Sequence, residues 1–116
     1  MKKICTTIEQ SKELIELGID RYTSDMCYWQ DRKYERPKAI SVLELYRILG
    51  ISMSQVQVIP AWSLSALLEL LPSATLDISN DHHYRMHCCK QFTDWHGTAL
   101  DAAVAMIKKL KEQNEL

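Results

Sequence analysis

The chain has 116 residues and a formal net charge of −1 at pH 7, from 14 basic and 15 acidic side chains. This length is typical of one domain, so we expect a single domain over residues 1–116. A composition of 47% hydrophobic and 25% charged residues is that of an ordinary globular protein and argues against disorder or a low-complexity tail. The small net charge gives no overall attraction towards nucleic acid.

The hydrophobic stretches are too interrupted for a membrane span. The longest, residues 56–71, contains Gln57, Pro60 and Glu69, and the N-terminus turns polar after Ile4 and Cys5. A membrane span needs about 18 consecutive apolar residues, and a signal peptide needs a longer apolar core than this. We therefore expect a cytoplasmic protein with no membrane contact, in which the cysteines remain thiols. They are Cys5, Cys27, Cys88 and Cys89.

The first half of the chain predicts two helices and two extended segments. Residues 7–17 form a helix that ends at Gly18, with a capping box from either Thr6 and Glu9 or Thr7 and Gln10. Residues 26–29 are rich in aromatic side chains and predict a strand, whereas the charged residues 31–38 predict a loop. A second helix begins after Ser41 and closes at Gly50, and residues 55–59 predict a brief extended segment.

The second half predicts a helix, short strands and a final helix. Ser63 caps a helix with leucines spaced along one face, and Pro72 ends it. Residues 75–79, 82–89 and 92–95 predict strands, and Thr98 caps the last helix. Its predicted buried face is Leu100, Ala103, Val104, Ile107 and Leu110. The whole order predicts an α+β fold, with a small antiparallel sheet of three to four strands and helices packed on one face.

Three segments, IPAWSLSALLELLP, CTTIEQSKELIELGID and LDAAVAMIKKLKEQ, together about half of the chain, carry a resemblance to a known group. They resemble small uncharacterised proteins encoded in phage and conjugative-element regions of gut bacterial genomes. The chain departs from that pattern in a long insert over residues 32–54 and in a shortened strand region near Lys90. The resemblance implies a mobile-element setting and a small α+β fold, and it brings no activity and no catalytic residue.

Two features favour nucleic-acid binding. The predicted loop carries a basic and aromatic patch of Arg32, Lys33, Tyr34, Arg36 and Lys38. Residues 41–58, from Ser41 to Val58, resemble a helix-turn-helix with Gly50 at the turn, although Pro60 and the β-branched residues before it argue against a long recognition helix. The α-β-β-β-α order of the second half is also similar to that of double-stranded RNA-binding domains, but residues 98–102 hold one acid and no base.

A cluster of histidine and cysteine on the strand of residues 82–89 raises a metal hypothesis. Alternation puts His83, His87 and Cys89 on one face, and His96 follows shortly after. Three nitrogen or sulfur ligands could hold zinc, but Arg85 shares that face and the spacing is loose. The alternative is a half-buried strand with Tyr84, Met86 and Cys88 in the core. In such a strand Cys88 and Cys89 point to opposite faces, which disfavours a bond between them.

No glycine-rich elbow or phosphate loop accompanies the thiols and histidines, and we expect no catalytic residue and no cofactor. The apolar helices exceed what one small sheet needs to cover. We therefore expect a non-enzymatic protein that acts through protein–protein contacts, including self-association through the helix of residues 64–71 or through a strand edge. Nucleic-acid binding is the alternative.

Overall fold

The computed structural model describes residues 4–29, 37–50 and 58–116. Within these ranges the chain forms an α+β fold, which confirms the predicted fold class. The elements are α1 (Ile8–Glu16), the 3₁₀ helix η1 (Arg21–Thr23), β1 (Met26–Trp29), β2 (Lys38–Ser41), α2 (Val42–Leu49), β3 (Ile59–Ala61), α3 (Leu64–Leu70), β4 (Thr75–Ile78), β5 (Tyr84–Cys88), β6 (Gln91–Phe92) and α4 (Ala99–Glu112). None of these helices is long and apolar enough to span a lipid bilayer.

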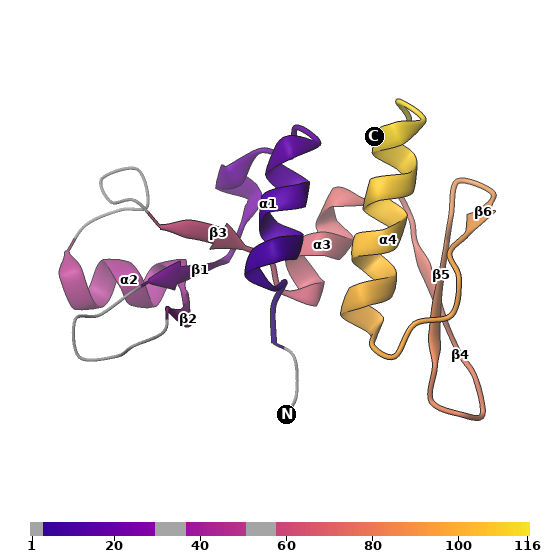
Figure 1. The fold of residues 1–116 in the computed structure, drawn as a ribbon, viewed down its shortest axis with the longest axis horizontal. Helices are drawn as coiled ribbons and strands as arrows, with labels where there is room; N and C mark the ends of the chain where they lie inside the picture. Colours follow the sequence, from indigo (N-terminus) through magenta and orange to yellow (C-terminus); the bar gives the residue numbers. More distant parts are fainter. Residues whose placement is uncertain (1–3, 30–36, 51–57) are drawn as a thin grey trace.

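The strands form two antiparallel sheets where the sequence predicts one. The first sheet has the order β2-β1-β3 and the second has the order β4-β5-β6. Figure 1 shows the sheets at opposite ends of the molecule, with α1, α3 and α4 between them. α1, α3 and α4 lie between the two sets of strands (Figure 1), and α4 packs against β5, so the two sheets stay apart.

The two N-terminal helices lie within one residue of their predicted ends. Of the two possible capping boxes, the structure uses Thr7 and Gln10, in which each backbone N–H donates to the other side chain at 3.0 and 3.1 Å. Gly18 follows α1 with a φ of 92°, and Gly50 closes α2 with a φ of 67°. Both values lie in the left-handed region that glycine adopts without steric cost.

The C-terminal helices also follow their sequence signals. Ser63 accepts the Ala66 N–H at the start of α3, and Thr98 accepts the Asp101 N–H at the start of α4 over 3.0 Å. The predicted inward face of α4 is buried, as expected from its apolar spacing. This face packs against α3 on one side and β5 on the other, which makes α4 the central helix of this half.

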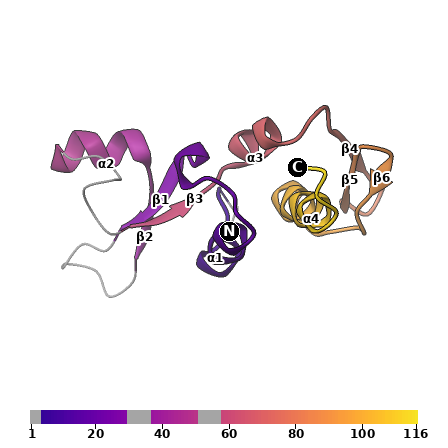
Figure 2. The ribbon, with the colours of Figure 1, turned by 90° about the horizontal axis from the view of Figure 1, so that it is seen from above.

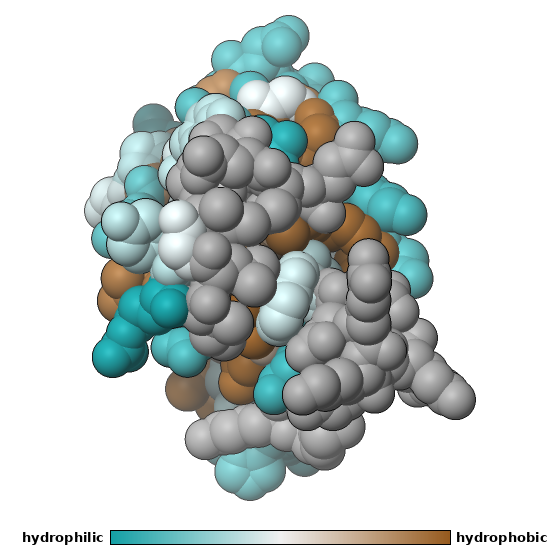
Figure 3. Space-filling model, turned by 90° about the vertical axis from the view of Figure 1, so that its left-hand side faces the viewer, coloured by the Kyte–Doolittle hydropathy of each residue, from teal (hydrophilic) through white to brown (hydrophobic). Residues whose placement is uncertain are grey.

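The core has one large and one small cluster. The large cluster unites α1, α3, α4 and β5 around the fully buried side chains of Leu14, Trp62, Leu67, Met86 and Ile107. The small cluster lies between α2 and the first sheet and contains Cys27, Ile40, Leu45 and Val58. Figure 3 looks onto that end of the molecule, where described hydrophobic residues reach the surface in separate patches.

Several strand boundaries differ from the prediction. Lys38 starts β2, although the charged stretch of residues 31–38 predicts a loop. The extended segment predicted for residues 55–59 begins as a strand at Ile59, and residues 55–57 lie outside the described ranges. The strand predicted for residues 82–89 spans only Tyr84–Cys88, because His82 and Cys89 have φ values of 60° and 54°, which depart from the extended backbone of a regular strand.

Candidate binding face on the second sheet

The pairing of β5 with the chain that follows β6 shifts by one residue. His87 pairs with Phe92, whereas Tyr84 bridges to His96. The chain takes four steps from Phe92 to His96 but three from His87 to Tyr84, so one extra residue is inserted. This insertion is a β-bulge, which is why the third predicted strand, residues 92–95, is regular only as Gln91–Phe92.

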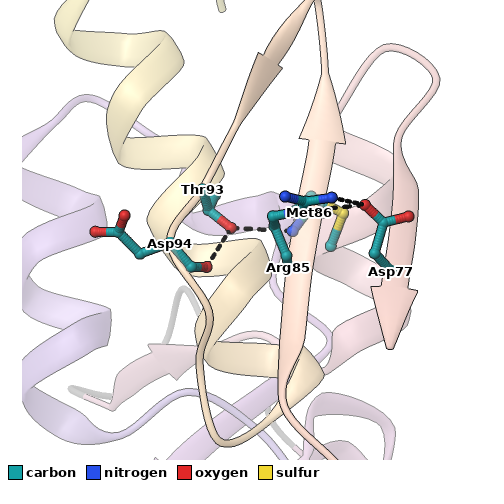
Figure 4. A network of polar contacts seen from close by, with 5 residues as sticks. All are labelled: Asp77, Arg85, Met86, Thr93 and Asp94. Carbon is teal, nitrogen blue, oxygen red and sulfur yellow. Dashed lines mark hydrogen bonds and ion pairs between the residues drawn. The ribbon is translucent and has the colours of Figure 1, made fainter. Parts of the chain in front are cut away.

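Thr93 holds the bulge in place. Its N–H donates to the Met86 carbonyl over 3.0 Å, and its hydroxyl oxygen accepts the Met86 N–H over 2.9 Å. The same hydroxyl donates to the Asp94 carbonyl over 2.9 Å. Figure 4 shows this hydroxyl between β5 and the segment after β6, with the Asp94 carboxylate directed away from Arg85. The Thr93 side chain thus supplies the acceptor that the bulge removes from the backbone ladder.

The bulge changes the face on which Trp95 lies. Tyr84 and His96 are bridge partners and share the inner face of the sheet, towards α4, so their neighbours Arg85 and Trp95 share the outer face. In a regular strand Phe92 and Trp95 would face opposite sides, because an odd number of steps separates them. The extra residue puts both aromatic rings on the outer face beside Arg85.

Five side chains form what we call the outer-face cluster: Asp77, Arg85, His87, Phe92 and Trp95. The Arg85 guanidinium carbon lies 4.5 Å from the centre of the Phe92 ring and 4.7 Å from that of Trp95. Arg85 Nη2 and Nε donate to Asp77 Oδ2 over 3.0 and 3.2 Å (Figure 4). The His87 ring stacks on Phe92 with centroids 4.2 Å apart and planes 10° from parallel.

The contacts within the outer-face cluster leave its two largest aromatic rings half-exposed. Phe92 and Trp95 keep 47% and 46% of their surface in solvent. Each cation–π contact at an exposed site contributes about 0.5–1 kcal/mol, and the ion pair contributes about as much at most. Figure 2 shows α4 on one side of this sheet and no described element on the other. Two large aromatic side chains are therefore accessible to a ligand on the uncovered face of the sheet.

The four predicted metal ligands occupy different parts of the hairpin and make different contacts. His87 stacks on Phe92, His96 bridges to Tyr84, His83 precedes β5 and Cys89 belongs to the turn after it. Among the described residues, no group of three or more His, Cys, Asp or Glu side chains is arranged to hold a metal ion. The predicted shared face fails for Cys89 because the strand ends one residue before it.

The prediction that Cys88 and Cys89 point apart is wrong. Their sulfur atoms lie 3.5 Å from each other, because Cys89 adopts a left-handed backbone conformation and leaves the strand alternation. Burial raises the pKa of the Cys27 thiol, and burial together with the hydrogen bond to Cys89 raises the pKa of Cys88 to about 11. Raised values keep both thiols protonated at neutral pH, which lowers their nucleophilicity.

The predicted nucleic-acid residues are only partly described. Lys38 is exposed at the start of β2, opposite Trp29, on the first sheet. Arg32, Lys33, Tyr34 and Arg36 lie outside the described residues, as do residues 51–57, where a second helix of a helix-turn-helix would begin. The first helix and the left-handed Gly50 are as predicted, and the chain forms β3 from Ile59 onward.

Comparison with protein-family models, with curated proteins and with solved structures finds no match. Sequence reasoning missed the outer-face cluster, since strand alternation assigns Phe92 and Trp95 to opposite faces. The signal present in the sequence was the odd spacing of Phe92 and Trp95. Two large aromatic residues at odd spacing, with a threonine between them, are compatible with one face only if a bulge intervenes.

Proposed function

We propose that this protein is a non-enzymatic binding module that recognises another protein through the outer-face cluster. The observation that carries the proposal is the pair of half-exposed rings, Phe92 and Trp95, lying against one guanidinium on the uncovered face of a sheet. Aromatic side chains and arginine are enriched at the centres of protein interfaces, and tryptophan and arginine dominate their binding energy. Their ordering in the free protein lowers the entropic cost of binding.

The charge on this face favours a protein over a nucleic acid. Asp77 already neutralises Arg85, so the outer-face cluster has no unpaired cation to contact phosphate. Binding to a phosphate backbone depends on several such cations. The complementary partner is a protein surface that places a flat aromatic or arginine side chain against the exposed parts of Phe92 and Trp95.

The α3 helix is a less suitable surface for association. Leu67 and Leu71 belong to the large core cluster, and Leu64 and Leu70 pack against it. The apolar side of this helix is therefore used within the chain, although Leu68 remains 39% exposed. This observation supports the second sheet rather than residues 64–71 as the contact region.

A cytoplasmic, mobile-element setting belongs to the same proposal. It rests on the resemblance of the three sequence segments to proteins of phage and conjugative-element regions, which brings no activity with it. An accessory protein of such an element would act on a partner without chemistry of its own.

A single-stranded nucleic acid is the second candidate ligand. The observation that favours it is the pair of exposed rings on a sheet face, which is where many RNA-binding folds stack bases. A double-stranded RNA mode has less support, although α3, β4, β5, β6 and α4 follow its order. The start of α4 is tied to α1, because Gln10 Nε2 donates to Asp101 Oδ1 over 2.8 Å, and it presents no lysine to phosphate.

Differential capture from a host-cell lysate tests the proposal. The baits are the wild-type chain, the double variant Arg85→Ala with Trp95→Ala, and the control Tyr22→Ala, which removes another exposed aromatic ring from the 3₁₀ helix η1. We expect at least one protein that the wild type and the control retain and the double variant loses, followed by direct binding of that protein in purified form. Equal retention by all three baits would contradict the proposal.

Fluorescence anisotropy with single-stranded RNA and with duplex DNA separates the two candidates. Protein recognition predicts no saturable binding at physiological salt. Binding that weakens steeply with salt and is lost on Trp95→Ala would assign the cluster to nucleic acid instead. Binding lost only when Arg32, Lys33 and Arg36 are replaced by alanine would assign it to the predicted basic loop.

A further inference from the structure

Cys88 and Cys89 bring two thiols together at a tight hairpin turn. Cys88 pairs with Gln91, so Cys89 and Lys90 are the two turn residues between β5 and β6. Their φ values are 54° and 65°, the pattern of a type I′ turn. Such turns favour Asn–Gly, because other residues lose free energy in the left-handed region. This chain instead places a cysteine and a lysine there.

The turn places the two sulfur atoms in van der Waals contact. Cys88 Sγ and Cys89 Sγ are 3.5 Å apart, and no disulfide joins them. Cys88 is 2% exposed, whereas Cys89 is exposed at the turn. The Cys89 thiol is therefore exposed to solvent, and the Cys88 thiol is buried next to it. The left-handed backbone of Cys89 and Lys90 is strained, and such strain concentrates at functional sites.

The distance between the two sulfur atoms suits one central atom bound to both of them with a bent S–X–S angle. Two sulfurs bound at about 2.3 Å with a tetrahedral angle lie about 3.8 Å apart, whereas a linear two-coordinate ion would need them about 4.6 Å apart. Within the described chain no further His, Cys, Asp or Glu joins the pair to make a three-residue metal site. A ligand that fits this pair therefore binds two sulfur atoms only and carries its own third substituent.

We propose that Cys88 and Cys89 form a dithiol site for a trivalent arsenical that carries one organic group. The reaction is a condensation of R–As=O with two thiols, giving R–As(S-Cys88)(S-Cys89) and one water. Two S–H bonds break and two As–S bonds form, the arsenic oxygen leaves with both protons, and arsenic stays in the +3 state. The exposed Cys89 reacts first, and Cys88 closes the ring because it is already in contact.

This site is separate from the outer-face cluster and does not depend on the proposed function. Its probe is phenylarsine oxide, followed by intact-mass spectrometry of the folded full chain. We expect one adduct for each chain that survives excess 2-mercaptoethanol and is removed by 2,3-dimercaptopropanol, with peptide mapping to residues 88 and 89. Because chelation makes the second bond intramolecular, Cys88→Ser and Cys89→Ser should each weaken the adduct about 100-fold.

A turn variant distinguishes loss of the site from loss of the fold. Cys89→Asn combined with Lys90→Gly restores the preferred type I′ residues, so we expect it to melt at a higher temperature than the wild type and take up no arsenical. The proposal is overturned if the wild type forms no dithiol-resistant adduct, if the adduct maps to Cys5 and Cys27, or if the turn variant still forms it.

Discussion

Thr93→Val tests the account of the bulge by removing one hydroxyl at nearly constant volume. Thr93 is 8% exposed, and its hydroxyl is the acceptor for the N–H of Met86, whose residue is fully buried. Valine leaves that N–H unpaired and also removes the bond to the Asp94 carbonyl. An unpaired buried donor costs about 1–3 kcal/mol.

We therefore expect Thr93→Val to lower the free energy of unfolding by about 2 kcal/mol. For a chain of this length that loss corresponds to a fall in melting temperature of roughly 8 °C. The control is Thr93→Ser, which keeps the hydroxyl and removes one methyl group, at a cost of about 0.8 kcal/mol.

Urea denaturation followed by circular dichroism, together with thermal melts, measures both variants. A Thr93→Val protein within 0.5 kcal/mol of the wild type would refute the role of the hydroxyl, with that margin set by the lower range of a net hydrogen bond, ~0.5 kcal/mol. Equal losses for valine and serine would refute it as well, because they would assign the effect to the methyl group.

Three further predictions concern pH, a helix end and the core. The fold favours the neutral Cys88 thiol, so this thiol contributes fully to the free energy of unfolding below its ordinary pKa of 9.0, and the contribution is lost as pH rises towards about 11. Urea midpoints of the wild type should therefore fall over that pH range, and those of Cys88→Ala should fall less. Gly18→Ala should cost about 1 kcal/mol in denaturant unfolding, because its φ of 92° suits only glycine. Leu67→Ala should cost about 2–5 kcal/mol in the same assay, whereas Leu68→Ala on the same helix should cost far less because that side chain is 39% exposed.

The helices could be predicted from the sequence because their signals are local. Thr7, Ser41, Ser63 and Thr98 each cap the helix that follows, and the apolar spacing of α4 identifies its buried face. The division of the strands into two sheets could not be predicted, because it depends on where α3 and α4 pack. The β2 strand escaped prediction because it is short, its first residue Lys38 belongs to the charged stretch, and its last residue Ser41 is the cap of the next helix.

The outer-face cluster and the Cys88–Cys89 pair escaped prediction because two local deviations interrupt the regular alternation of side chains along a strand. A single inserted residue after Phe92 carries Trp95 to the outer face, and a left-handed Cys89 turns its thiol towards Cys88. Alternation rules assume a regular strand, so they assign both side chains to the wrong face. Neither a bulge nor a type I′ turn built from Cys and Lys has a strong sequence signature.

Photo-crosslinking from position 75 tests the proposed binding face most directly. Thr75 is exposed and pairs with His87, so it shares the outer face with the cluster, whereas Tyr22 lies on the 3₁₀ helix η1 and serves as the control position. With benzoylphenylalanine at position 75 we predict a crosslink to one discrete protein that disappears when Trp95→Ala is added. A crosslink that persists in that variant, or that forms equally from position 22, would contradict the account.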